Sequence, residues 1–61
     1  MEGEYYLVGW EDYFNGAPFR KEYEKWVTAN QTGYERGRLD AAEVHLIVGR
    51  KLSYDEGKYY L

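Results

Sequence analysis

Cysteine is absent from this chain, and histidine occurs only once among its 61 residues. The chain therefore has no disulfide or thiolate metal site, and one imidazole is too few for the usual histidine-based site, so we expect no metal and no cofactor. A domain this small buries only a modest core and needs further stabilisation. Aromatic residues make up 20% of the chain. We expect an aromatic core and, because the aromatics exceed what one small core can bury, a homodimer.

Long hydrophobic runs are also missing, since the longest aliphatic run is Leu46-Ile47-Val48. The sequence contains no pattern typical of a membrane span or a signal peptide. With neither cysteine nor an export signal, we expect a cytoplasmic protein, in the host cell if a phage encodes it. We expect one small domain over residues 1–61, with residues 1–4 and 53–61 frayed or forming an edge.

Basic residues are missing from the N-terminal third. Residues 1–19 carry acidic side chains but no Lys or Arg, and the net charge of the chain is -3. Phosphate binding needs clustered cations, so an aromatic nucleic-acid-binding module ranks last, although Tyr5-Tyr6 and Tyr59-Tyr60 offer rings for base stacking. An acidic chain is better suited to a protein partner with a basic surface, such as a DNA-binding enzyme.

Two aromatic, β-prone runs, residues 5–14 and 19–28, flank the Asn15-Gly16 pair. Asn-Gly is a strong hairpin signal because both residues tolerate positive φ, and Pro18 keeps the preceding residue extended. A turn at 15–18 therefore predicts an antiparallel hairpin, in which Gly9 marks a bulge or the close approach of another backbone. The cross-strand pairs that stabilise this register include Phe14/Phe19, Trp10/Tyr23 and Tyr6/Val27.

The remainder of the chain has to cover this hairpin, which is marginal alone. Thr28 or Asn30 caps a short helix that Gly33 weakens and Gly37 ends. Residues 41–52 fit either a helix, capped through Asp40 and Glu43, or a strand, and we favour a strand over 43–52. Residues 53–61 contain a turn at 54–57 and then an edge strand or a tail. The predicted fold class is α+β: a β-hairpin plus a third antiparallel strand with one short helix, as a homodimer.

One face of the predicted hairpin mixes acidic and aromatic side chains. Glu11 faces Glu22 there, and two carboxylates can form an acid/base couple. A chain of this size without an evident pocket is a poor enzyme scaffold, however, so we predict no enzyme. His45 lies in an apolar run and is interpreted as a partly buried, hydrogen-bonded structural residue. Tyr and Trp beside carboxylates are typical of a protein-binding surface.

Several strings resemble the small uracil-DNA glycosylase inhibitors of protein-primed phages, a family of dimers built from a hairpin, a short helix and a third strand. They are the Tyr-led acidic opening, the second-strand string Lys21-Glu22-Tyr23-Glu24-Lys25, and the string from Ala41-Ala42-Glu43-Val44 through Lys51-Leu52. Tyr34-Glu35 is similar to an aromatic–Glu pair of the family's helix. The resemblance implies a DNA mimic: acidic groups stand in for phosphates, and an apolar pocket at the dimer interface receives a loop of the glycosylase.

We therefore expect an inhibitor that binds a host DNA-processing enzyme, most concretely uracil-DNA glycosylase, and blocks its DNA-binding channel. The alternative is a small structural or assembly protein that forms a homo-oligomer through aromatic sheet faces. The expected partner-binding residues are Glu11, Tyr13, Glu22, Glu24, Trp26, Tyr34 and Glu35.

Overall fold

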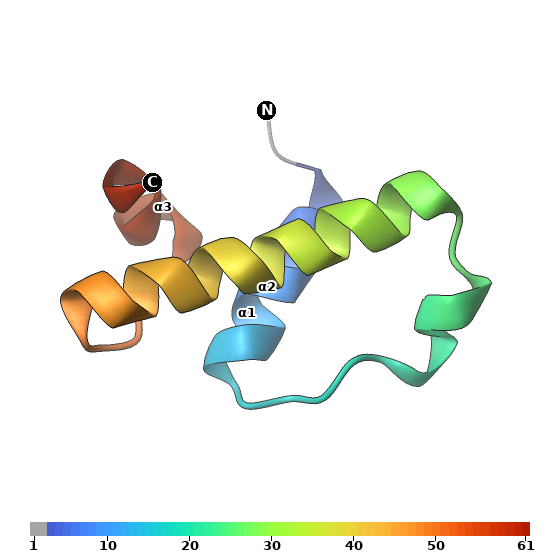
Figure 1. The fold of residues 1–61 in the computed structure, drawn as a ribbon, viewed down its shortest axis with the longest axis horizontal. Coiled ribbons are helices and arrows are strands. Elements are labelled where there is room, and N and C mark those ends of the chain that lie inside the picture. Colours follow the sequence, from blue (N-terminus) through green and yellow to red (C-terminus); the bar gives the residue numbers. More distant parts are fainter. Residues whose placement is uncertain (1–2) are drawn as a thin grey trace.

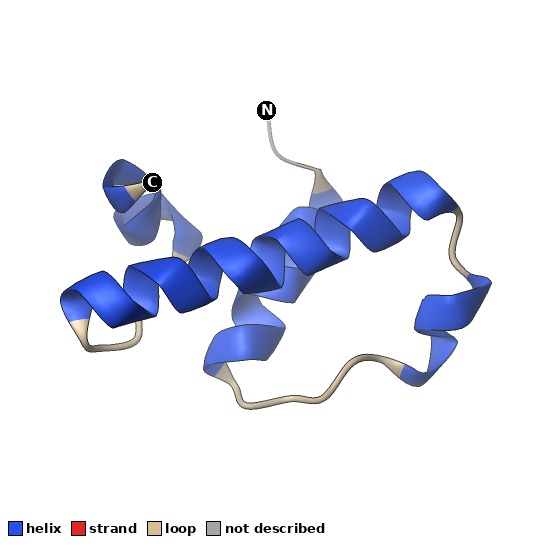
Figure 2. Cartoon of the chain, viewed as in Figure 1, coloured by secondary structure: helices blue, strands red, loops and turns tan. Residues whose placement is uncertain are grey.

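The computed structural model describes residues 3–61 and shows a helical chain (Figures 1 and 2). Helix α1 (Glu4–Phe14) is followed by a short 3-10 segment, η1 (Lys21–Lys25), and by the long helix α2 (Thr28–Val48). A one-turn helix, α3 (Tyr54–Gly57), continues into a 3-10 turn, η2 (Lys58–Tyr60). No strand occurs between residues 3 and 61. The predicted α+β fold, with its hairpin at 5–14 and 19–28 and its strand at 43–52, is therefore wrong.

Helix α1 forms because its buried residues recur with helical spacing. Tyr6, Gly9 and Trp10 stand at i, i+3 and i+4 and so share one face, which is buried. The helix begins at Glu4, so the expected fraying of residues 1–4 is wrong at that position, and residues 1–2 lie outside the described part of the chain. Helical spacing therefore decides the structure here over the β propensity of the aromatic side chains.

The Asn-Gly signal ends α1 and does not turn a hairpin. Gly16 has φ 70, and its N–H donates to the carbonyl of Tyr13 at 3.0 Å. The next N–H, from Ala17, donates to the carbonyl of Asp12 at 2.9 Å. These two bonds form the Schellman motif, in which a left-handed glycine satisfies the last carbonyl groups of a helix. Pro18 then keeps the chain from resuming a helix.

Helices α1 and α2 cross at Gly9 and Gly37, where their backbones touch. A Cβ added at Gly37 would lie 2.0 Å from the carbonyl oxygen of Tyr6, and one at Gly9 would lie 2.2 Å from that of Tyr34. Only glycine fits at such a crossing. The close backbone approach predicted as one alternative for Gly9 is confirmed. The prediction that Gly37 ends a short helix is wrong, because α2 continues to Val48.

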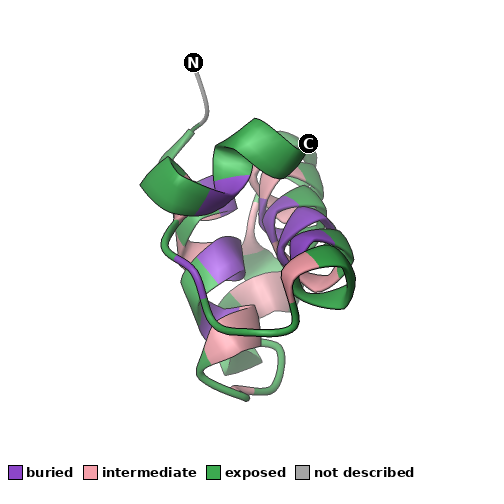
Figure 3. Ribbon diagram, turned by 90° about the vertical axis from the view of Figure 1, so that its left-hand side faces the viewer, coloured by how far each residue is buried: buried purple, intermediate pink, exposed green. Residues whose placement is uncertain are grey.

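The core lies between the two long helices and is closed by the C-terminal segment (Figure 3). Trp10 is 1% exposed, and its indole N–H donates to the carbonyl of Leu52 at 2.9 Å. Tyr54 packs edge-on against Trp10 with 5.4 Å between ring centroids. Ser53 caps α3 in a capping box with Glu56. Residues 53–57 therefore belong to the fold, and the edge strand predicted as one alternative within 53–61 is wrong, because no strand occurs there. The buried apolar residues are Tyr6, Trp10, Tyr34, Ala41, Val44 and Leu52.

Candidate functional site

A buried carboxylate network around Asp12 joins α1, Arg20 at the N-cap of η1, and α2. Arg20 donates two hydrogen bonds to Asp12, from Nε at 3.0 Å and from Nη2 at 3.1 Å. The hydroxyl of Tyr34 donates to the same carboxylate at 2.6 Å, and Arg38 donates to that hydroxyl at 3.1 Å. Asp12 is 6% exposed and Tyr34 is fully buried. The carboxylate is therefore satisfied by charged and neutral donors, as a buried charge requires.

The protonation states of Asp12 and Tyr34 follow from these contacts. The hydrogen bond from Arg20 holds the pKa of Asp12 below its usual value, although burial acts in the opposite direction. Burial and the bond to Asp12 together raise the pKa of the Tyr34 phenol. Asp12 is thus ionised and Tyr34 neutral at neutral pH. Both groups link the two helices.

A second Tyr–Asp–Arg group lies further along the same helix pair. The hydroxyl of Tyr6 donates to Asp40 at 2.5 Å, and Arg36 Nε lies 3.2 Å from the other carboxylate oxygen. Asp40 is 6% exposed. Because a tyrosine of α1 bonds an aspartate of α2 here, while a tyrosine of α2 bonds an aspartate of α1 at the first network, the two helices are cross-linked in both directions.

An aromatic layer holds η1 against α2. The ring of Trp26 lies edge-on to Tyr34 with centroids 5.2 Å apart, and to Tyr5 of α1 at 4.7 Å. Gln31 also donates to the carbonyl of Tyr23 at 2.8 Å. The segment is therefore fixed on α2 by packing as well as by hydrogen bonds. Its outward side chains, which include Glu22 and Glu24, are presented to solvent from a defined position.

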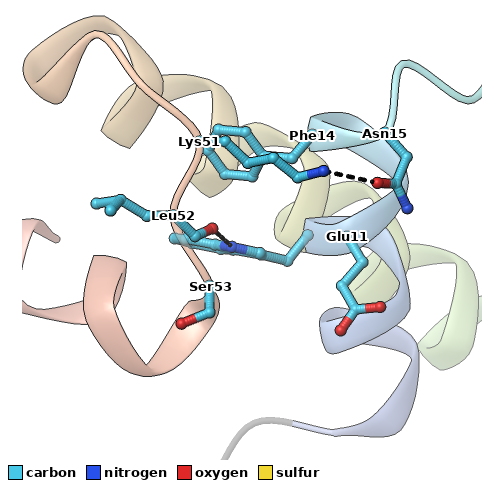
Figure 4. Close-up of a pocket in the computed structure, with 7 residues that line it drawn as sticks. Glu11, Phe14, Asn15, Lys51, Leu52 and Ser53 are labelled. Atoms are coloured by element: carbon cyan, nitrogen blue, oxygen red, sulfur yellow. Dashed lines mark hydrogen bonds between the residues drawn. The ribbon is translucent and has the colours of Figure 1, made fainter.

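A small hollow lies where the loop before α3 passes the end of α1 (Figure 4). Lys51 donates to Asn15 at 3.1 Å across one side, and Glu11 stands on the α1 side. Its volume of about 280 Å³ falls just below the usual range for small-molecule sites, about 300–1,000 Å³. Its lining consists of Trp10, Glu11, Phe14, Asn15, Lys51, Leu52 and Ser53.

The residues predicted to bind a partner are spread over three elements. Glu22 and Glu24 are exposed on η1 beside half-buried Trp26, whereas Tyr34 is 0% exposed and lies in the core. Glu35 follows it on α2 and is exposed. With no hairpin, the register that paired Glu11 with Glu22 does not exist.

The remaining two predicted side chains lie on α1. Glu11 is exposed at the rim of the hollow. Tyr13 is half-buried, and its hydroxyl lies 2.9 Å from Nδ1 of His45. The predicted hydrogen bond of His45 is thus confirmed, but its predicted partial burial is wrong, because the residue is exposed.

Two outer surfaces were missed because they depend on helical spacing. On α1, Glu4, Leu7 and Glu11 are exposed at i, i+3 and i+7. On α2, Leu39 and Leu46 are 51% and 87% exposed and also stand two turns apart. Both patterns are present in the sequence and would have been found had these segments been interpreted as helices.

Within residues 3–61, no group of three or more His, Cys, Asp or Glu side chains is placed to hold a metal ion. No described helix combines the length and apolar character needed to cross a membrane. No protein-family model matches the chain, and neither a curated protein nor a solved structure is similar to it at a significant level.

Proposed function

We propose that this protein works by binding another protein through the acidic outer face of α1, and not by catalysis. The observation that carries the proposal is the uncompensated charge of this helix. Glu4 and Glu11 are exposed, and α1 contains no Lys or Arg. Its third acid, Asp12, points inward and is neutralised by Arg20. An outer face of this kind attracts a basic surface and repels an acidic one.

Leu7 gives this face an apolar centre. It is 40% exposed and lies between Glu4 and Glu11 on the same side of the helix. Interfaces commonly place an apolar contact inside a polar or charged rim. The contact supplies affinity, while the two carboxylates guide approach and orientation.

Among partners with a basic surface, a DNA-processing enzyme is the class we propose, and uracil-DNA glycosylase is the specific hypothesis. The channel of such an enzyme is shaped to bind phosphates. The hairpin scaffold implied by the resemblance is absent from the described chain. DNA mimicry here therefore rests on carboxylates of α1, because Glu22 and Glu24 of η1 are flanked by the exposed Lys21 and Lys25.

The test is uracil excision from a duplex by a purified bacterial glycosylase, with this protein in molar excess. We expect inhibition at low salt that weakens as ionic strength rises, because the attraction is electrostatic. Glu4→Lys with Glu11→Lys should abolish inhibition. Glu22→Lys with Glu24→Lys makes the same charge change on η1, and this double variant should retain most of the inhibition. Undiminished excision at low salt rejects the glycosylase as the partner, and equal loss in both double variants rejects the α1 face.

The alternative, an assembly protein that associates through aromatic sheet faces, loses its surface. The sheet is absent from residues 3–61, and Trp10 and Tyr34 are buried within a single chain, at 1% and 0% exposed. Part of the aromatic excess that suggested a homodimer is therefore used inside one chain, whereas Phe19, Tyr59 and Tyr60 are exposed.

A further inference from the structure

The hollow at the end of α1 carries two side chains of opposite charge. Glu11 comes from α1, and Lys51 comes from the loop between α2 and α3. Both are exposed, and neither takes part in an ion pair within residues 3–61. Figure 4 shows Glu11 apart from Lys51, whose ammonium instead donates to the side-chain oxygen of Asn15 at 3.1 Å. The hollow therefore has an anionic side and a cationic side.

Both sides have hydrogen-bonding capacity to spare. An ammonium has three N–H donors, and Lys51 uses one of them on Asn15. The amide nitrogen of Asn15 and the carboxylate of Glu11 form no hydrogen bond to another described side chain. The hydroxyl of Ser53, in contrast, is engaged in the capping box of α3. Lys51 and Asn15 can thus hold an anionic group, while Glu11 can hold a cationic one.

The rest of the lining is apolar. It consists of Trp10, Phe14 and Leu52. Phe14 is half-buried, whereas Trp10 and Leu52 are 1% and 4% exposed, so Phe14 offers an occupant the largest apolar contact. A molecule that fits this hollow combines an apolar part with a cationic and an anionic group.

We propose that the hollow binds a free α-amino acid with an apolar side chain. Its ammonium donates to Glu11, its carboxylate accepts from Lys51 and Asn15, and its side chain packs on Phe14. The N–H of Asn15 donates to the carbonyl of Glu11, so these residues stand one helical turn apart, about 6 Å along the axis. The two charged groups of an α-amino acid share one carbon, which suits this short separation and the small volume of about 280 Å³.

This site does not rest on the proposed function. Glu11 belongs both to the hollow and to the acidic face of α1, but Lys51 lies outside that face. Lys51→Gln should therefore weaken binding of the amino acid and retain inhibition of a glycosylase. If the chain binds no amino acid, the acidic face is unaffected, and if it inhibits no glycosylase, the amino-acid site is unaffected.

An NMR titration of the nitrogen-15-labelled full chain with L-leucine tests the site. We expect saturable shifts centred on the backbone amides of residues 11–15 and 51–53. The indole N–H of Trp10 should shift with them, because it donates to the carbonyl of Leu52 at the hollow. No saturable shift at tens of millimolar leucine, or shifts centred on another surface, overturns the proposal.

Two analogues of leucine test the need for both charges. Leucinamide lacks the carboxylate, and N-acetylleucine lacks the ammonium. Each should bind several-fold more weakly than leucine, because it loses a charge-assisted hydrogen bond. If both analogues bind as tightly as leucine, the hollow takes only an apolar group and the proposal is wrong.

Side-chain variants assign each charge to its partner. Lys51→Gln should weaken leucine several-fold and no longer distinguish it from leucinamide, since the two changes remove the same contact. Glu11→Gln should likewise no longer distinguish leucine from N-acetylleucine. Lys25→Gln and Glu4→Gln make the same changes at exposed positions outside the hollow and should bind leucine as the unmodified chain does. If Lys51→Gln still prefers leucine to leucinamide by the original factor, Lys51 does not hold the carboxylate and the proposed arrangement is overturned.

Discussion

Replacing Gly37 with alanine places a methyl group inside the crossing of α1 and α2. The new Cβ would lie 2.0 Å from the carbonyl oxygen of Tyr6 and 3.0 Å from the backbone nitrogen of Trp10. Both neighbours are backbone atoms, so no side-chain rotation relieves the overlap. Ordinary contact begins at 3.4 Å, and the two helices have to separate by more than an ångström to reach it.

The magnitude follows from two opposing effects. Alanine in place of glycine favours a helix by about 1 kcal/mol. Overpacking a well-packed crossing costs about 1–3 kcal/mol or more, and separation of the helices also loosens the contacts of Trp10 and Val44. We expect a net loss of about 2 kcal/mol in the free energy of unfolding. A core of this size supplies about 3–5 kcal/mol in total, so the variant should be close to unfolding.

Gly33→Ala is the matched control on the same helix. A Cβ at Gly33 meets nothing closer than the backbone nitrogen of Tyr6 at 3.8 Å, which is ordinary contact. This variant should be stabilised by up to about 1 kcal/mol, the helix propensity gain alone. Urea unfolding followed by circular dichroism and tryptophan fluorescence measures both. If Gly37→Ala is as stable as the unmodified chain, or if it matches Gly33→Ala, the backbone contact at the crossing does not exist.

Three further predictions concern the buried networks and the C-terminal cap. The hydrogen bond from Arg20 lowers the pKa of Asp12 in the folded protein. Asp12 therefore stabilises the fold above the ordinary carboxyl pKa of about 3.9, and this stabilisation is lost as the pH falls through the lower folded pKa. Asp12→Asn should reduce this loss of stability at acid pH in unfolding measurements. Tyr34→Ala should cost about 3–5 kcal/mol in thermal unfolding because it empties a fully buried site, and a stable variant that only loses a binding partner would contradict its core position. Ser53→Ala removes the α3 cap, worth about 1 kcal/mol, and should speed amide exchange in residues 54–57 before it affects α2; unchanged exchange there would refute the cap.

At the Asn15-Gly16 pair, the local sequence predicted the backbone conformation but not the kind of turn. The sequence indicated a residue with positive φ ahead of Pro18, and Gly16 has φ 70. A hairpin turn and a Schellman cap both need that conformation. The choice between them depends on what precedes the glycine, and the helical spacing of Tyr6 and Trp10 was the evidence that favoured the cap.

The glycines of α2 led us to predict a short helix, and that prediction was wrong because of a tertiary contact. Gly33 and Gly37 lower the intrinsic helix propensity, so the sequence predicted a short helix that stops. Gly37 is instead required inside a longer helix, because α1 crosses at that residue. No local rule includes this contact, which exists only once both helices have formed.

The exposure of the carboxylates was predictable from their charge. Glu11, Glu22, Glu24 and Glu35 are all exposed. Tyr34 was not predictable as a core residue, because Asp12, which accepts the hydrogen bond of its buried hydroxyl, lies 22 residues away in the sequence. Which apolar side chains face outward depends on whether the segment is a helix or a strand. Because we predicted a strand over residues 43–52, the sequence analysis did not identify Leu39 and Leu46 as neighbours on one exposed face.

The central claim is that two helices cross at their glycines and leave their outer faces free, and proton NMR of the full chain tests it most directly. We expect sequential amide–amide contacts throughout residues 28–48, together with contacts between the Hα protons of Gly9 and Gly37 and the backbone of the opposite helix. Cross-strand contacts between residues 5–14 and 19–28 would contradict the helical fold and both of the surfaces that it presents.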